Sequence, residues 1–273
     1  MRVKFDKASV LETIINLAKE MNGEPVVSVR YIGGGGFGLV YKVAFNSGKV
    51  QVMKAFKVAE SMQVEARSLQ ELRRACPLNI PKIYYTNVAN NKYPFDVIAM
   101  EYIHGENAVK VKLPFSLKKR KQFTDVLIDS VGKMHDYDCG SKYGFIGSDE
   151  IFESWQEFYK DFLLKVFDEV KEFCQDGRRL SRKIYSLLEL GVINIDYILS
   201  EPVEKPSLVH GDIWLPNVMV KKSTFEPVGI IDPLNAMFGD KEYDLFPLNA
   251  PVKRSLRLYQ TYKDRLKLAK RLI

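Results

Sequence analysis

The sequence predicts an α+β protein with two lobes, a small one built on an antiparallel β-sheet and a larger one that is mainly helical. β-Branched and aromatic residues, interrupted by turn residues, dominate residues 25–57, as expected for short neighbouring strands. From residue 122 onward, apolar residues recur mostly at helical spacing. We therefore expect an N-lobe over residues 1–103 and a C-lobe over residues 104–273.

Composition narrows the class of protein. The 273 residues are 46% hydrophobic and 27% charged, which excludes a disordered or collagen-like chain. The net charge of +7 suits an anionic ligand such as a nucleotide, but it is too small to indicate nucleic-acid binding. Three cysteines, Cys76, Cys139 and Cys174, lie far apart and in no metal-ligand spacing, which favours a reducing compartment. No apolar run approaches the ~20 residues that cross a bilayer, and the N-terminus lacks a signal-peptide pattern, so we expect a cytoplasmic protein with no membrane partner.

The N-lobe is expected to begin with a helix over residues 6–20, where apolar residues recur among charged ones. A glycine run then separates the first two strands, and turn residues 46–48 separate the second from the third. Pro77 and Pro81 end a second helix. The expected strands cover residues 26–32, 39–45, 49–56 and 95–103, and the second helix covers residues 59–75.

The C-lobe is expected to follow a linker near residues 102–106. One β-rich block over residues 208–232 interrupts an otherwise helical pattern. The expected helices cover residues 122–135, 152–173, 178–190 and 243–273, the last broken at Pro247 and Pro251. We expect the basic residues of the C-terminal helix, which include Lys253 and Arg265, to form a solvated face rather than a nucleic-acid site.

The glycine run matches the pattern G-x-G-x-x-G-x-V at Gly33, Gly35, Gly38 and Val40. No Gly-Lys-Ser/Thr follows it, as a Walker loop requires, and no helix follows it, as a Rossmann turn requires. A glycine loop between two strands can instead lay backbone N–H groups over nucleotide phosphates. A glycine-rich hairpin without a ligand is the alternative reading of the same residues.

Lys54 and Glu65 form the second candidate feature. Lys54 lies on the third strand, and Glu65 falls on the apolar side of the following helix with Met62 and Leu69. A carboxylate on an apolar face is costly unless it is paired. We therefore expect an ion pair between Lys54 and Glu65, with the ammonium group directed toward phosphates.

The β-rich block carries the strongest signal. Asp212 and Asn217 occupy a turn between two short apolar strands, and Asp232 ends the second strand. Asn217 and Asp232 offer the hard oxygen ligands that Mg²⁺ prefers, while Asp212 can accept a proton from an attacking hydroxyl. Turn-forming Asp and Asn residues without a catalytic role are the alternative.

Several motifs follow one another along the chain, in the order glycine loop, Lys54, Glu65, Met100–Ile103, His210-Gly-Asp212, Asn217 and Ile231-Asp232. Together and in this order, they resemble the aminoglycoside phosphotransferase and fructosamine kinase family of the protein-kinase-like fold. Three segments resemble the fructosamine kinases of this family more closely than the aminoglycoside phosphotransferases. They are His210-Gly-Asp-Ile-Trp214, residues 239–245 and residues 153–159. The resemblance covers roughly residues 26–248.

The resemblance implies a role for each matching residue. Asp212 would be the catalytic base, Asn217 and Asp232 would bind magnesium, and Lys54 would contact ATP phosphates with Glu65 as its partner. Main-chain groups of Glu101 and Ile103 would meet the adenine, and His210 and Trp214 would support the catalytic turn. Asp240 and Asp244 would be structural, and His104 and His135 are expected to be surface or capping histidines.

Departures from the protein kinases also carry information. Gly211 stands where the catalytic loop of protein kinases has an arginine, and Pro-Leu follows Asp232 where they have Phe-Gly. A protein substrate and a phosphorylation switch are therefore not expected. The helical insert over residues 110–206 would instead supply a cleft for a small molecule.

We expect an ATP- and Mg²⁺-dependent kinase acting on a hydroxyl of a small, sugar-derived molecule such as a fructosamine. An aminoglycoside O-phosphotransferase is the alternative, and a non-catalytic nucleotide-binding module is a remote one.

Acidic residues of the insert could serve a polycationic substrate, but lysines interleaved with them dilute the acidic field. We expect Trp155, Tyr159 and Trp214 to form an aromatic wall for a neutral sugar derivative. The acidic residues are Asp149, Glu150, Glu153, Glu157 and Asp161, and the lysines are Lys160, Lys165 and Lys171.

Overall fold

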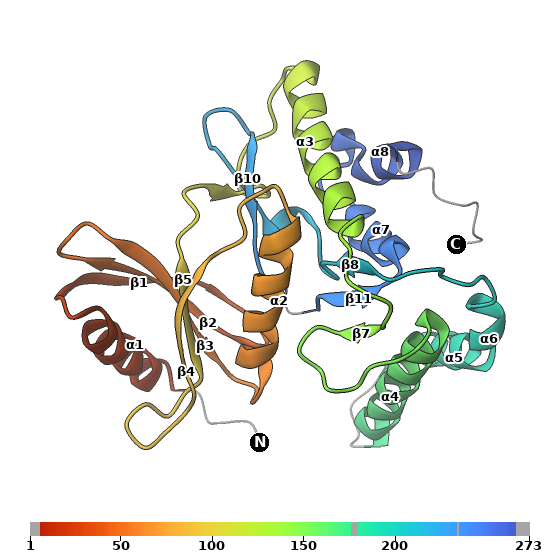
Figure 1. The fold of residues 1–273 in the computed structure, drawn as a ribbon, viewed down its shortest axis with the longest axis horizontal. Helices are drawn as coiled ribbons and strands as arrows, with labels where there is room; N and C mark the ends of the chain where they lie inside the picture. Colours follow the sequence, from red (N-terminus) through yellow and green to blue (C-terminus); the bar gives the residue numbers. More distant parts are fainter. Residues whose placement is uncertain (1–5, 176–179, 234, 266–273) are drawn as a thin grey trace.

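The computed structural model describes residues 6–175, 180–233 and 235–265. A five-stranded antiparallel sheet and two helices lie on one side of Figure 1, and most of the helices lie on the other. The sheet has the strand order β1-β2-β3-β5-β4. Its strands are β1 (Val26–Gly34), β2 (Gly38–Phe45), β3 (Val50–Phe56), β4 (Ile83–Asn87) and β5 (Val97–Glu101). This α+β arrangement confirms the predicted fold class.

Two helices cover opposite faces of the sheet (Figure 1). The buried side of α1 (Lys7–Asn22) packs on strand residues such as Val43 and Met53. The buried side of α2 (Ser61–Ala75) packs on the other face, in a core that continues into the C-lobe through α3 (Leu117–His135). Because this core crosses from one lobe to the other, the sheet and the catalytic segment are held against each other.

The strand β4 was not assigned from the sequence. It lies between Pro81 and a turn-rich segment, spans only five residues, and pairs with β5 alone at the edge of the sheet. Its side chains are half-buried or exposed, so no run of buried apolar residues marks it. The expected strands on either side of it are confirmed.

Helix boundaries in the C-lobe follow capping residues. Helix α3 begins at Leu117, five positions before the predicted start, because the Ser116 side chain accepts a hydrogen bond from the Lys119 N–H. Ser154 accepts from Glu157 at the start of α4 (Trp155–Gln175). Ser181 likewise caps α5 (Arg182–Ile193), which the short helix α6 (Ile195–Ile198) follows.

Two small sheets build the region around residues 208–232, which carry Asp212, Asn217 and Asp232. Their strand orders are β10-β9-β6 and β7-β11-β8. The strands are β6 (Glu106–Asn107), β7 (Gly144–Phe145), β8 (Ser207–Val209), β9 (Val218–Val220), β10 (Pro227–Ile230) and β11 (Met237–Gly239). Three of them, β8, β9 and β10, correspond to the β-rich block predicted over residues 208–232.

The C-terminal segment is broken more often than predicted. It contains a 3₁₀ turn at Lys241–Asp244, α7 (Leu245–Leu248), a 3₁₀ turn at Arg254–Leu256 and α8 (Leu258–Arg265). Residues 266–273 of the predicted helix lie outside the described residues. Within the described part of the chain, no helix is long and apolar enough to span a membrane.

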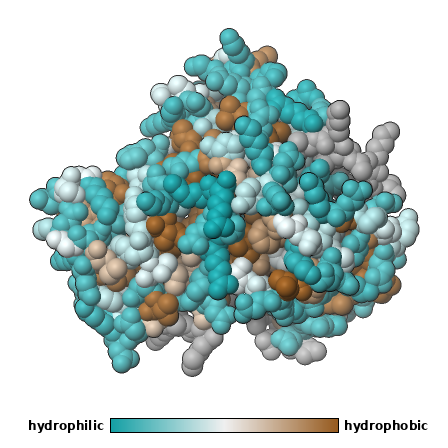
Figure 2. All heavy atoms as spheres, in the orientation of Figure 1, coloured by the Kyte–Doolittle hydropathy of each residue, from teal (hydrophilic) through white to brown (hydrophobic). Residues whose placement is uncertain are grey.

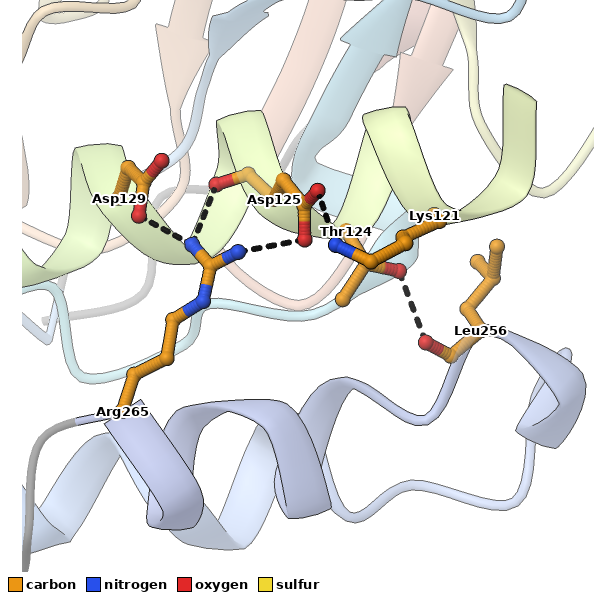
Figure 3. A network of polar contacts seen from close by, with 6 residues as sticks. All are labelled: Lys121, Thr124, Asp125, Asp129, Leu256 and Arg265. Atoms are coloured by element: carbon orange, nitrogen blue, oxygen red, sulfur yellow. Dashed lines mark hydrogen bonds and ion pairs between the residues drawn. The ribbon is translucent and has the colours of Figure 1, made fainter. Parts of the chain in front are cut away.

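Helix α8 is fastened to α3 by polar contacts (Figure 3). Arg265 donates to Asp125 Oδ1 at 2.5 Å and also pairs with Asp129, and Thr124 Oγ1 donates to the Leu256 carbonyl at 2.8 Å. Lys253 turns inward as well and donates to the Ala108 carbonyl at 2.6 Å. Arg265 remains exposed to solvent while it makes these contacts, as expected, whereas the expectation of a solvated face is wrong for the partly buried Lys253.

Candidate active site

A cavity of about 150 Å³ lies between the five-stranded sheet and the β9–β10 hairpin. Its walls are mostly apolar, and Lys54, Glu65 and Asp232 stand at one part of its lining. The remaining lining residues are Ile32, Val40, Val52, Pro81, Met100, Glu101, Tyr102, Ile103, Met219 and Ile231.

The glycines of the β1–β2 hairpin have different reasons for lacking side chains. A Cβ on Gly38 would lie 2.4 Å from the Ala55 carbonyl oxygen, and one on Gly34 would lie 2.6 Å from that of Gly38. Gly33 and Gly35 meet nothing within 4 Å of the Cβ position. Strand packing thus requires glycine at Gly34 and Gly38, whereas Gly33 and Gly35 leave space for a ligand to approach the backbone.

Lys54 bridges two carboxylates from distant parts of the chain. Its Nζ lies 2.5 Å from Glu65 Oε2 and 2.8 Å from Asp232 Oδ1, so the predicted Lys54–Glu65 pair is confirmed. Burial would lower the pKa of Lys54, but the two carboxylates outweigh it and raise the pKa above its usual value. Burial raises the pKa of Glu65 to about 7, although Lys54 opposes that shift. The ammonium group is therefore held charged at the cavity wall.

The turn after β8 brings Asp212 and Asn217 together. Asn217 Nδ2 donates to Asp212 Oδ2 at 2.8 Å and to the Asp212 carbonyl at 2.9 Å. Burial, aided by the negative charge of Asp232, raises the pKa of Asp212, while the Asn217 and Trp214 side chains act to lower it. A half-buried carboxylate with a raised pKa is a better proton acceptor than an exposed one.

Asp232 is held close to this turn in an unusual backbone conformation. Its φ is 64°, a left-handed value that few non-glycine residues adopt. The N–H of the preceding Ile231 donates to the Asn217 carbonyl at 2.9 Å, which ties the segment of Asp232 to that of Asn217. Such strained positions cluster at functional sites.

Asn217 and Asp232 fit a magnesium ion that also binds phosphate. Among the described residues, no group of three or more His, Cys, Asp or Glu side chains could hold a metal by itself. Mg²⁺ commonly uses only one or two protein carboxylates together with substrate phosphates. Because Asn217 donates through Nδ2, its Oδ1 is left as an acceptor, and Asp232 is 49% exposed toward the cavity that it lines.

Asp244 anchors the backbone of the catalytic turn. Its carboxylate is fully buried and accepts hydrogen bonds from the N–H groups of His210 at 3.2 Å and Gly211 at 2.9 Å. Gly211 has a φ of 77°, and a Cβ there would lie 2.1 Å from the Asn235 carbonyl oxygen. Only glycine fits this position, which explains in physical terms why the arginine of protein kinases is absent.

The His135 side chain extends this anchor, and the expectation that it is a surface or capping histidine is wrong. Its side chain is buried, with Nε2 2.9 Å from Asp244 Oδ2 and Nδ1 2.5 Å from the Tyr262 hydroxyl oxygen. Asp244 can only accept, so Nε2 donates to it, and the Tyr262 hydroxyl that contacts Nδ1 also donates to the Lys241 carbonyl at 3.1 Å. Sequence reasoning gave His135 no role at the turn and did not single out Tyr262, because both contacts join residues far apart in the sequence.

His210 is also fully buried, beside the catalytic turn rather than in the cavity. Its Nδ1 accepts a hydrogen bond from the Asp212 N–H at 3.3 Å. Burial is the main influence and lowers the pKa of His210, so the ring is neutral near pH 7. A neutral ring that bonds to backbone is suited to support the turn.

The predicted aromatic wall needs one correction. Trp155 is 5% exposed and packs in a core cluster with Val209 and Met237, so it does not line a cleft. Tyr159 stacks on Trp155 with ring centroids 5.0 Å apart, and Tyr243 lies edge-on to Tyr159 at 6.1 Å. Burial raises the pKa of Tyr243 to about 12, with Tyr159, Asp244 and Asp212 as further causes. Tyr243 therefore lies near Asp212, although the sequence reasoning did not include it in the wall.

The acidic residues of the insert are largely neutralised by neighbouring lysines. Lys165 pairs with both Glu150 at 2.7 Å and Asp161 at 2.9 Å, and Lys142 pairs with Glu153. These pairs support the expectation that the acidic field is diluted. A strongly acidic cleft is not built from them.

The fold and the site together define a phosphotransferase of the protein-kinase-like class. A sequence profile of the phosphotransferase enzyme family matches residues 28–266, and the chain belongs to that family. A comparison with curated protein sequences found no match.

Solved structures share the fold at low sequence identity. A Thermobifida fusca protein assigned as a fructosamine-3-kinase is 22% identical, with 94% of this chain and 85% of that chain covered and a TM-score of 0.66. A thermostable mutant of aminoglycoside phosphotransferase APH(4)-Ia, in complex with ADP and hygromycin B, is 12% identical, with 93% and 83% covered and a TM-score of 0.70. Macrolide 2'-phosphotransferase type I is 16% identical, with 97% and 84% covered and a TM-score of 0.62.

Proposed function

We propose that this phosphotransferase moves the γ-phosphoryl group of ATP to a hydroxyl of a small, sugar-derived molecule, with Mg²⁺ as cofactor. The observation that carries the proposal is that Lys54 and Asp232 meet at the cavity wall, while the segment of Asp232 is hydrogen-bonded to the turn that pairs Asp212 with Asn217. These residues supply a cation, a proton acceptor and two oxygen ligands, which are the groups that phosphoryl transfer requires. A module that only binds nucleotide would not need Asp212.

Each residue has a distinct task in this mechanism. Lys54 would neutralise phosphate charge, and Glu65 would hold the ammonium group in place. Asp212 would orient the acceptor hydroxyl and take its proton as the new bond to phosphorus forms. Asn217 and Asp232 would hold Mg²⁺, which when bound neutralises charge on the transferring group.

The apolar part of the cavity suits the adenine ring. Val40 and Val52 face it from the sheet, and Met219 and Ile231 belong to the strand and segment on the other lobe. The Glu101 side chain accepts from Asn79 Nδ2 at 3.1 Å and from the Lys82 N–H at 3.2 Å. These bonds fix the connection between the lobes, so the main chain of Glu101 and Ile103 is preorganised to meet the ring.

For the acceptor we propose a neutral or singly charged sugar derivative, with a ketoamine such as a fructosamine first. Tyr243 offers aromatic surface on the side of Asp212, with Tyr159 packed edge-on against it, and lysines pair with acidic residues of the insert. Solved relatives bind hygromycin B with ADP, or kanamycin with GDP, so an aminoglycoside is the second candidate. The Thermobifida fusca relative supports the first candidate.

The test is a comparison of kcat/KM for a glycated amine and for kanamycin, at saturating Mg²⁺-ATP and two salt concentrations. We expect the glycated amine to be the better substrate and its kcat/KM to depend little on salt, because few charges leave water. A higher kcat/KM for kanamycin that falls steeply with salt would overturn this ranking. Absence of transfer to every acceptor, with ATP still bound, would favour the non-catalytic module.

A further inference from the structure

The turn between β1 and β2 has almost no side chains that could fix its shape. Residues 33–36 are all glycine, none of them has a left-handed φ, and a Cβ at Gly35 or Gly36 would meet nothing within 4 Å. Glycine tolerates opposite orientations of a peptide plane at similar cost, so the carbonyl and N–H groups of this turn can exchange sides. The orientation that suits a phosphate therefore needs a contact from outside the turn.

Lys57, the residue directly after β3, supplies such a contact. Its Nζ donates to the Gly35 carbonyl at 2.8 Å, and its backbone N–H donates to the Phe37 carbonyl at 2.8 Å. One residue thus holds two carbonyl groups of the turn, while the Gly36 N–H has no acceptor within the described part of the chain. Lysines are common on the largely hydrophilic surface seen in Figure 2, so the informative feature of Lys57 is its acceptor and not its charge.

The side from which Lys57 approaches follows from the alternation of side chains along β3. Lys54 lines the cavity, whereas Ala55 packs on the α1 side of the sheet. Lys57 lies two positions beyond Ala55, so its ammonium group reaches the Gly35 carbonyl from the α1 side. Because the Gly35–Gly36 peptide bond is trans, its N–H points opposite to its carbonyl and thus toward the cavity side.

We propose that Lys57 is a positioning residue that turns the Gly35–Gly36 peptide so that the Gly36 N–H meets a phosphate oxygen of ATP. This role rests on the proposed binding of ATP at the cavity. The ammonium group also polarises the peptide to which it is bonded, which strengthens the hydrogen bond that the N–H donates on the other side. Lys54 acts on the phosphates from the cavity face, and Lys57 acts from behind the turn through one peptide group.

Calorimetry with two ligands tests this role: the Mg²⁺ complex of a non-hydrolysable ATP analogue, which carries the phosphates, and adenosine, which lacks them. Lys57→Met should weaken binding of the analogue by about tenfold or more, the effect of losing one hydrogen bond to a charged group, and should leave adenosine binding unchanged. Lys57→Arg, which keeps a cationic donor, should restore the affinity for the analogue. The matched control Lys19→Met removes the same charge from an exposed position on α1 and should bind both ligands as the wild type does.

Backbone amide NMR separates this role from a direct contact between the Lys57 side chain and a phosphate. Binding of the analogue should move the Gly36 amide proton downfield in the wild type, because the N–H gains a hydrogen bond, and should not do so in Lys57→Met. A loss of affinity in Lys57→Met without any shift of the Gly36 amide in the wild type would overturn the proposal, since the side chain would then bind the phosphate itself.

Three calorimetric outcomes also count against the proposal. Equal affinities of Lys57→Met and Lys19→Met for the analogue would leave Lys57 with no role beyond its charge. Equal losses for the analogue and for adenosine in Lys57→Met would indicate general damage to the N-lobe. A wild type that binds the analogue no more tightly than adenosine is a separate failure, because it overturns the proposed ATP site and this role of Lys57 with it.

Discussion

Replacing Lys54 by methionine should make the stability of the protein depend on pH in a way that Glu65 explains. The change removes the ammonium group 2.5 Å from a carboxylate that is only 2% exposed. Without its partner, buried Glu65 is expected to take up a proton rather than remain charged. Asp232 loses the same partner, but its side chain is 49% exposed, so water can solvate its negative charge.

The free-energy cost of protonating Glu65 sets the size of the expected loss of stability. A carboxyl with a usual pKa of 4.5 needs about 1.36 kcal/mol per pH unit above 4.5 to stay neutral. The loss from Glu65 is thus at most about 2 kcal/mol at pH 6 and about 5 kcal/mol at pH 8. Since the pKa is raised in the folded state, the folded state binds more protons, and stability falls as pH rises from 4.5 toward the folded pKa.

Urea unfolding of Lys54→Met and of Lys54→Met/Glu65→Gln at pH 6 and pH 8 measures this effect. The stability of the single variant is compared with that of the double variant at the same pH, which removes the titration of groups other than Glu65. Relative to the double variant, the single variant should be about 2–3 kcal/mol less stable at pH 8 than at pH 6. An equal pH dependence in the two variants would refute the reasoning.

Three further predictions concern the catalytic turn. Asp212→Asn should lower the phosphotransfer rate by about 10²–10⁴-fold with little change in ATP affinity, since the amide cannot accept a proton; activity within a few-fold of wild type would remove Asp212 from its role. Mg²⁺-ATP should raise Tm much more than ATP alone, because Asn217 and Asp232 bind phosphate through the ion; equal shifts with and without magnesium would contradict the metal site. Gly211→Ala should cost at least about 1–2 kcal/mol from its left-handed φ alone, with a further loss from the contact at 2.1 Å to Asn235. Unchanged Tm and activity in Gly211→Ala would show that the turn is not constrained as described.

The features that could be predicted from the sequence depend on local rules. A carboxylate on the apolar side of a helix needs a cation, and that rule alone paired Glu65 with Lys54 across eleven positions. A second local rule is that polar residues at the ends of neighbouring short strands lie close together. That rule placed Asp212, Asn217 and Asp232 at one site. The strands 26–32, 39–45 and 49–56 were correct because alternation and turn residues bound each of them.

The features that could not be predicted depend on tertiary contacts between distant residues. His135 looked like an ordinary residue at a helix end, and its partners Asp244 and Tyr262 lie 109 and 127 positions away. Trp155 at the start of a helix could face a cleft or a core, and no local pattern distinguishes the two. The edge strand β4 lacks a buried face, so its sequence carries little signal.

The hydrogen bond between Tyr262 and His135 has a consequence for the order of events during synthesis. The catalytic turn contains Asp212, but the chain of contacts that holds its backbone is completed only by a residue fifty positions later. While Tyr262 is still inside the ribosome, Asp244 and His135 lack the hydroxyl that fixes the ring, although the glycine loop and Lys54 have long since emerged. The nascent protein should therefore complete the glycine loop and the Lys54–Glu65 pair before the backbone of the Asp212 turn is fully held.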